Sequence, residues 1–182
     1  MLLYRQDKTT QAAELFLELR GGRMSYLKLM KLLYLADRET LHRWGRPITF
    51  DSYASMDKGP ILSTTLNLMT DEPSPSYPSY WQDHIVTDMA NHEVVLERAT
   101  SKDQLSEAER NVIRQVFRDH GQKSRWQLVD FTHTLPEWRD SHGSSLPIEI
   151  RDILVAGGWT EEDARDAIEE LEAENAARRL WT

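Results

Sequence analysis

The sequence predicts a mainly α fold (α+β), a single compact domain over residues 1–182 with about six to seven helices and one small antiparallel β-hairpin or sheet. Three observations support this prediction. Apolar residues recur at helical spacing in several segments, capping residues and glycines bound those segments, and two short β-prone runs flank a turn. A length of 182 residues suits one domain, with an expected core over about 8–140 and a C-terminal helical extension over about 147–180.

The first two helices are predicted over residues 7–20 and 25–44. In the first helix, apolar residues recur at the spacing of one helix face, and these residues are Ala12, Leu15, Phe16 and Leu19. The pair Gly21-Gly22 ends this helix, because glycine readily adopts the left-handed conformation just past a helix C-terminus. Gly45 ends the second helix in the same way, with Pro47 behind it.

The second helix is apolar on most of its surface, which predicts a central position covered by other elements. Its polar residues fall on one narrow wedge, and these residues are Lys28, Lys31, Arg38, Glu39 and His42. Asp37 is the exception, because it falls on the opposite side of the helix, among apolar residues. An isolated buried carboxylate is costly, so we expect Asp37 to be paired, hydrogen-bonded or raised in pKa.

The middle of the chain is predicted to be less regular. Residues 48–57 contain aromatic residues without a clean period and indicate a short strand or an extended segment. Gly59-Pro60 is predicted to form a turn that leads into a helix over residues 61–69, since proline is favoured at the start of a helix. Three prolines within residues 71–80 predict an extended loop.

One hairpin and four helices are predicted in the second half of the chain. Two β-prone runs, over residues 84–89 and 92–98, flank Ala90-Asn91 and predict the hairpin. Ser106 with Glu109 three residues later forms a capping box. The expected helices run from Ser106 to His120, from Ser124 to about Thr134, from Ile148 behind Pro147 to Ala156, and from Thr160 to about Arg178.

Composition and charge favour a cytoplasmic protein whose partner is another protein. The chain has no cysteine, which fits a reducing compartment, and no run approaches the roughly 20 apolar residues needed to span a membrane. The net charge of -8 argues against general nucleic-acid binding. Residues 1–50 carry nine Lys and Arg against five Asp and Glu, and the remainder carries 13 against 25. This division suits an electrostatically steered protein partner or reflects two faces of one fold.

The sequence offers few candidates for chemistry. No pair of its six histidines has the i, i+4 spacing of a helical zinc motif, and we expect no metal or cofactor. Asp37 could act as an acid or base with His133 as its companion, but a structural carboxylate bound to a backbone N–H, an Arg or a His is favoured. His133 is expected to belong to a structural cluster at a helix end, with Trp138 packed beneath it.

Gly21-Gly22 between two helices also allows a helix-turn-helix interpretation, with Lys28 and Lys31 on the second helix. That helix is too apolar to lie in a DNA groove while its own protein covers it. A DNA-binding regulator of a mobile element therefore stays an alternative. An enzyme that uses Asp37 or His133 is a second, less favoured alternative.

Four segments, taken in order, resemble a known family. They are Lys28-Leu29-Met30-Lys31-Leu32-Leu33-Tyr34-Leu35-Ala36, Trp44-Gly45-Arg46-Pro47-Ile48, Ala54-Ser55-Met56-Asp57-Lys58-Gly59-Pro60-Ile61, and Thr132-His133 with Pro136-Glu137-Trp138. Over about residues 8–140 the chain is similar to the Panacea domain of SocA-like antitoxins. Gly59 and Pro60 match the Gly-Pro segment of that family, and His133, Pro136 and Trp138 match its Thr-His…Pro-Trp segment.

The resemblance implies an antitoxin of a bacterial type II toxin–antitoxin pair, carried on a prophage or another mobile element, that neutralises a cognate protein toxin by direct binding. For the SocA branch it also implies an adaptor role towards a cytosolic protease. Some members carry an added DNA-binding domain, and no such segment is found in this sequence, so operator binding is not expected. The family has no established catalytic residues, so we expect no enzyme.

Aromatic and basic residues supply the expected protein-binding surface, because Tyr and Trp are typical interface residues. The candidates are Tyr77, Tyr80 and Trp81 in the proline-rich loop, together with Lys28, Lys31 and Arg38 on the second helix. The alternative for the three aromatic residues is that they staple the loop onto the domain.

Overall fold

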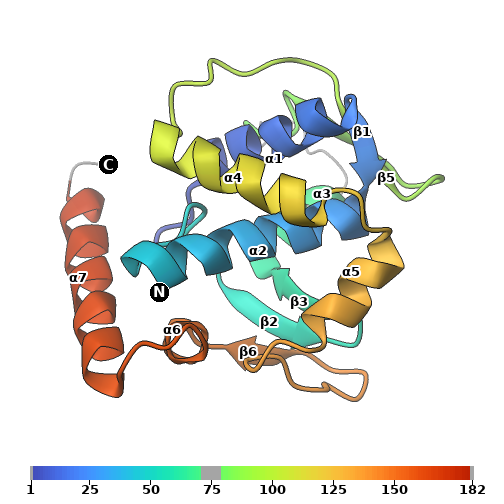
Figure 1. The fold of residues 1–182 in the computed structure, drawn as a ribbon. Helices are drawn as coiled ribbons and strands as arrows, with labels where there is room; N and C mark the ends of the chain where they lie inside the picture. The colour runs from blue at the N-terminus through green and yellow to red at the C-terminus, as the bar shows by residue number, and fades with distance from the viewer. Residues whose placement is uncertain (1, 71–78, 181–182) are drawn as a thin grey trace.

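The computed structural model describes residues 2–70 and 79–180 (Figure 1). Within those residues the chain forms seven helices and six strands, which confirms the mainly α prediction. In chain order the elements are α1 (Gln6–Arg20), β1 (Arg23–Ser25), α2 (Tyr26–Trp44), β2 (Tyr53–Met56), β3 (Gly59–Leu62), α3 (Ser63–Thr70), β4 (Ile85–Asp88), β5 (Glu93–Leu96), α4 (Glu107–His120), α5 (Arg125–Thr132), β6 (Leu146–Ile148), α6 (Ile150–Ala156) and α7 (Glu161–Arg179).

Helix α2 lies at the centre of the fold, as its apolar surface predicts. Helices α1, α4, α5 and α6 all pack against it, and Figure 1 shows it crossing the molecule with α4 above it and β2 and β3 beneath. Leu29, Leu32, Leu33 and Leu41 of α2 are at most 1% exposed. Burial of such side chains is the main favourable contribution to folding, so α2 is the element on which the others assemble.

The predicted hairpin is confirmed, and it belongs to a three-stranded antiparallel sheet in the order β1-β5-β4. Strand β4 pairs with β5 along its whole length. On the other edge of β5, β1 places Arg23 opposite Val95, and Arg23 forms an ion pair with Glu93 at 3.0 Å. The sequence does not predict β1, because three residues are too few to show an alternating pattern.

A second three-stranded antiparallel sheet, in the order β3-β2-β6, corrects two predictions. Gly59 and Pro60 do not form a turn before a helix. They begin β3, where they pair with Met56 and Ser55 of β2, and helix α3 begins only at Ser63. Pro60 is compatible with this position because β3 is an edge strand, where a missing N–H is tolerated.

The other edge strand of this sheet, β6, replaces the predicted start of a helix. Pro147 and Ile148 pair with Ala54 and Tyr53 of β2, and α6 begins at Ile150. Proline suits both a helix start and an edge strand. The pairing with β2, a segment far away in the sequence, decides between them.

Capping boxes begin helices α4 and α5. Ser106 Oγ accepts a hydrogen bond from the Glu109 backbone N–H at 3.2 Å, and the Glu109 carboxylate accepts one from the Ser106 N–H at 2.8 Å. Ser124 and Gln127 repeat this arrangement at α5. The predicted helix starts at Ser106 and Ser124 are therefore confirmed.

We expect Ser106→Ala to lower the free energy of unfolding by about 1 kcal/mol, because it removes the acceptor of a first-turn N–H. Chemical denaturation followed by circular dichroism measures this change. Ser145→Ala is the matched control, since Ser145 is exposed and its side chain makes no hydrogen bond in the described part of the chain. A Ser106→Ala variant as stable as the wild type would contradict the capping argument.

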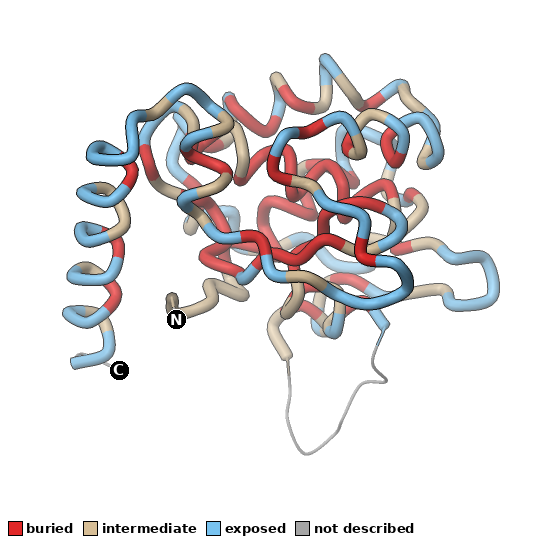
Figure 2. The backbone as a smooth tube through the Cα atoms, turned by 90° about the horizontal axis from the view of Figure 1, so that it is seen from below, coloured by how far each residue is buried: buried red, intermediate tan, exposed pale blue. Residues whose placement is uncertain are grey.

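Helix α7 exposes most of its surface, and its buried positions face the rest of the fold (Figure 2). Ala164 and Leu171 are 0% and 4% exposed. Arg46, which follows α2, donates two hydrogen bonds of 2.5 and 2.7 Å to the carboxylate of Glu174. The helix is therefore attached by a narrow apolar stripe and by a bidentate ion pair.

Candidate functional site

Asp37 is completely buried and serves as a hydrogen-bond acceptor for the segment that follows α2. Its Oδ1 accepts from the backbone N–H groups of Ile48 and Thr49 at 2.8 and 3.0 Å. Its Oδ2 accepts from the hydroxyl of Tyr53 at 2.8 Å and from that of Thr49. The prediction of a structural carboxylate that binds backbone N–H groups is therefore confirmed, and His133 is not among its partners.

Burial raises the pKa of Asp37 from 3.8 to about 6, although the four hydrogen bonds oppose this shift. A carboxyl whose pKa is higher in the folded state favours folding below its unfolded-state pKa, and this contribution is lost as the pH rises through the folded-state pKa. Asp37 should therefore stabilise the protein less at neutral pH than in mild acid.

We expect the free energy of unfolding of the wild type, minus that of Asp37→Asn, to fall by about 2 kcal/mol as the pH rises from 4 to 7. This is less than the full shift at about 1.4 kcal/mol for each unit of pKa, because the unfolded-state carboxyl is already more than half ionised at pH 4. Urea denaturation of both proteins over this range measures the difference. Taking the difference removes the contribution of carboxylates such as Asp103, whose pKa is lowered to about 2. A difference that does not change with pH would contradict the assignment.

Asp51 is a second buried carboxylate, and it binds the start of α3. It accepts hydrogen bonds from the backbone N–H groups of Ser52, Thr64 and Thr65 at 2.8 to 2.9 Å, and from the Thr65 hydroxyl at 2.7 Å. Thr64 and Thr65 lie in the first turn of α3, where N–H groups have no partner within the helix. The sequence does not single out Asp51, because Thr64 and Thr65, its partners in α3, lie more than ten residues away.

Phe50 lies between these two carboxylate-bound segments and has a φ of +56°. This conformation is strained for a bulky side chain, and such strain persists only where the surroundings impose it. Asp37 and Asp51 impose it from the two sides of Phe50. The Phe50 ring lies 5.2 Å from the guanidinium carbon of Arg46 and 5.0 Å from that of Arg178 of α7.

The two lysines of the polar wedge of α2 face the interior, whereas Arg38, Glu39 and His42 are half-buried, which corrects the prediction of Lys28 and Lys31 as surface residues. Lys28 is 7% exposed, and its Nζ donates to the carbonyls of Gly121 and Lys123 at 2.5 and 2.8 Å. Lys31 is 0% exposed, and its Nζ donates to the Pro60 carbonyl at 2.7 Å. Burial lowers the pKa of Lys31 to about 7. Carbonyl groups of neighbouring elements therefore accept hydrogen bonds from both buried amines.

The predicted cluster at the end of α5 is confirmed. The rings of His133 and Trp138 are stacked, with centroids 4.0 Å apart and planes inclined by 14°, and Trp138 Nε1 donates to the Met56 carbonyl at 3.2 Å. The Glu137 carboxylate accepts from the Tyr34 hydroxyl and from Arg38 Nε at 2.9 and 2.7 Å. These contacts join the segment after α5 to α2 and β2.

The proline-rich loop does not present Trp81 to solvent. Trp81 is 0% exposed and belongs to the hydrophobic core, so the interpretation of Trp81 as an exposed interface residue is wrong. Tyr80 is half-buried, and its ring lies 4.6 Å from that of His84. Tyr77, the third aromatic candidate, lies outside the described residues. For Trp81 the structure therefore supports the alternative that its side chain packs into the domain.

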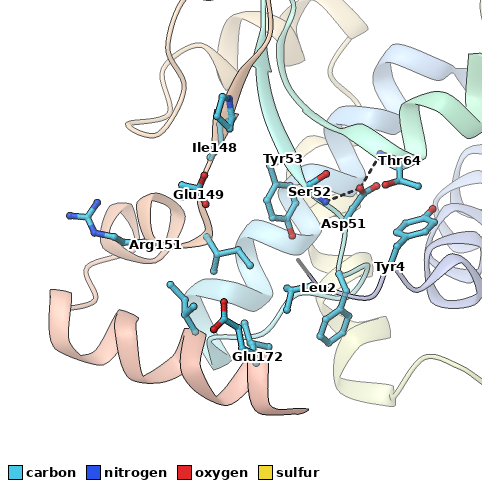
Figure 3. Close-up of a pocket in the computed structure, with 15 residues that line it drawn as sticks. Leu2, Tyr4, Asp51, Ser52, Tyr53, Thr64, Ile148, Glu149, Arg151 and Glu172 are labelled. Carbon is cyan, nitrogen blue, oxygen red and sulfur yellow. Dashed lines mark hydrogen bonds between the residues drawn. The ribbon is translucent and has the colours of Figure 1, made fainter. Parts of the chain in front are cut away.

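A pocket lies between α7 and the rest of the fold, with a cavity volume of about 450 Å³ (Figure 3). We call it the α7 pocket. Its lining comes from the N-terminal segment, residues 50–53, α3, the β6–α6 segment and α7. The apolar part of this lining includes Leu2, Tyr4, Phe50, Ile148, Ile150, Ile168 and Leu171. Asp37 does not line the pocket, but it binds Tyr53, which does.

Two further properties concern only the residues that the structure describes. Over these residues, the structure brings together no group of three or more His, Asp or Glu side chains that could hold a metal ion. Over the same residues, none of the helices is both long and apolar enough to cross a lipid bilayer.

The fold is thus that of a small mainly α domain whose central helix, β2–β3 hairpin and post-α5 segment are joined by internal polar contacts. The family model for the antitoxin SocA-like Panacea domain matches residues 29–139, more than half of the chain. The protein belongs to this family. No curated protein and no solved structure matches the chain. Lys31, Gly59 and Trp138 lie within the matched residues, whereas α1, α6 and α7 lie outside them.

Proposed function

We propose that this protein is the antitoxin of a type II toxin–antitoxin system and that it neutralises a cognate protein toxin in the cytoplasm by binding it directly. Membership of the SocA-like Panacea family is the observation that carries the proposal. The internal contacts of Asp37, Lys31 and His133 support it. Asp37 and Lys31 form hydrogen bonds within the fold and His133 stacks on Trp138, so each side chain has a structural role. A preformed domain is also suited to binding, since little order has to be gained on association.

Co-expression with each neighbouring open reading frame tests the proposal. One neighbour is expected to arrest growth when expressed alone, and co-expression of this protein should restore growth and yield a stable complex on purification. Rescue without a complex would contradict neutralisation by direct binding. The absence of any toxic neighbour would contradict the antitoxin function itself.

Asp37→Asn separates a binding protein from an enzyme. We expect this variant to neutralise the toxin as well as the wild type at any temperature at which circular dichroism shows it to be folded, because Asp37 is buried and makes only internal hydrogen bonds. Growth rescue and toxin affinity are the measurements. A folded variant that binds the toxin but no longer protects the cell would instead indicate that Asp37 takes part in catalysis.

The proposal extends to a cytosolic protease that receives the bound toxin from this protein. The half-life of the toxin should then shorten when this protein is present, and deletion of the protease should restore it. A toxin half-life that does not depend on this protein would leave neutralisation by binding alone.

A further inference from the structure

We propose that the α7 pocket receives an apolar segment of the toxin that carries basic side chains. This inference rests on the proposed function and names the binding site and the chemistry of its occupant. Three features carry it: the apolar lining of the pocket, two lining carboxylates that have no partner among the described residues, and a wall around Phe50 that internal hydrogen bonds hold in place.

The lining of the pocket is suited to an apolar occupant. Side chains of Leu2, Ile148, Ile150 and Ile168 reach it from segments that are far apart in the sequence. Ligand pockets of about 300–1,000 Å³ are typical of sites that bury a compact ligand, and the cavity volume of about 450 Å³ lies in this range. The pocket is therefore large enough for a few side chains of a bound segment.

The charges at the pocket favour a basic occupant. Glu149 and Glu172 line it and are exposed, and neither carboxylate forms an ion pair or hydrogen bond with any described residue. Arg151 is the only basic residue that lines the pocket among the described residues, and it is already paired with Glu161 at 2.5 Å and Asp152 at 3.0 Å. A cationic side chain of a partner would therefore meet two unpaired carboxylates, which is the arrangement that guides association.

Residues 50–53 form one wall of the pocket, and this wall is already ordered before anything binds. Asp37 and Asp51 hold the backbone on either side of Phe50, and Arg46 joins that wall to α7 through Glu174. A wall that is already ordered loses little entropy on binding. Strained residues held by their surroundings often occur at binding sites, and Phe50 is such a residue with its side chain at the pocket.

Charge reversal at the pocket tests the electrostatic part of the inference. The double variant Glu149→Lys/Glu172→Lys is expected to weaken the toxin complex by about tenfold or more and to slow association most strongly at low salt. The matched control is Glu162→Lys/Glu169→Lys, which changes the net charge equally. Glu162 and Glu169 are exposed on α7, do not line the pocket and have no ion pair among the described residues.

Filling the pocket tests the steric part. Ser52 lines the pocket, is exposed, and its hydroxyl makes no hydrogen bond within the described residues, so Ser52→Trp blocks the pocket without removing a contact. Toxin binding should be lost in Ser52→Trp and retained in the control Ser145→Trp, whose position is also exposed but lies outside the pocket. Thermal denaturation of each variant confirms that it is folded.

Crosslinking identifies the occupant, because the chain has no cysteine of its own. Ala173 is exposed next to Glu172 on α7 and does not line the pocket, so a label there does not fill it. Ala173→Cys labelled with a photoreactive maleimide should crosslink the toxin, and Ser145→Cys should not. The probe is the neighbouring gene product that the wild type neutralises and with which it co-purifies.

The outcomes separate this inference from the proposed function. If the wild type neutralises the toxin and the pocket variants do so equally well, the inference is overturned and the antitoxin function stands. A crosslink between two copies of this chain would assign the pocket to self-association and overturn the inference as well. If the wild type neutralises no neighbouring gene product, both fail together.

Discussion

Replacing Asp37 with Ala is expected to lower the free energy of unfolding by about 3–5 kcal/mol, because it leaves several buried neutral donors without an acceptor, at a cost of about 1–3 kcal/mol each. The substitution leaves the N–H groups of Ile48 and Thr49 and the Tyr53 hydroxyl without their acceptor in the interior. It also frees one side of the strained Phe50 backbone. Equilibrium denaturation at constant pH measures the loss.

Asp130→Ala is the control for this prediction, because Asp130 is exposed and has no partner among the described residues. Its stability should match that of the wild type to within about 0.5 kcal/mol. The Tyr53→Phe variant then tests the network, since the effects of Tyr53→Phe and Asp37→Ala should be less than additive. A loss of less than about 1 kcal/mol in Asp37→Ala would mean that water replaces the carboxylate.

Gly59→Ala is the second large effect, with an expected loss of about 3 kcal/mol or more in the free energy of unfolding from backbone strain and overpacking. Gly59 has a φ of +90°, and a Cβ atom at this position would lie 2.5 Å from Thr132 Oγ1 and 3.1 Å from Lys31 Nζ. Neither atom can move freely, because Lys31 is bound to the Pro60 carbonyl and Thr132 to the Val129 carbonyl.

Gly143→Ala separates backbone strain from crowding. Gly143 also has a positive φ, of +83°, but a Cβ atom there would meet no atom within 4 Å. Its substitution should therefore cost only about 1–2 kcal/mol, the contribution of backbone conformation alone. Adding Thr132→Ala to Gly59→Ala should restore part of the stability. Equal losses in the two glycine variants would contradict the role of close approach at Gly59.

The sequence predicts the helical elements well where the signals are local. Ser106, Ser124 and Thr160 mark helix starts because a side-chain cap acts within three residues. Local sequence patterns are misleading where the structure of a segment depends on distant segments. Gly59-Pro60 and Pro147 lie in edge strands because both strands pair with β2, and pairing partners cannot be found from local propensity. Tertiary context therefore overrides a preference that is sound for an isolated segment.

In the candidate site, too, local patterns predict some features and miss those that depend on tertiary contacts. The helical phase of Asp37 predicts its burial correctly, because that phase depends only on spacing along α2. The same reasoning fails for Lys28 and Lys31, since other elements cover this part of α2 and their carbonyl groups accept hydrogen bonds from the two amines. The α7 pocket and the strain at Phe50 could not be predicted, because they arise from segments that only the tertiary fold brings together.

The position of the α7 pocket has a consequence for how such proteins diverge. One wall is built from residues within the family match, and the opposite wall comes from α7 and the β6–α6 segment, which lie outside it. Helix α7 exposes most of its surface and packs against the rest through few side chains. Mutations on that helix can therefore accumulate with little penalty to the inherited core. If the pocket binds the toxin as we propose, substitutions in α7 would change which toxin is bound, while the opposite wall and the core stay the same.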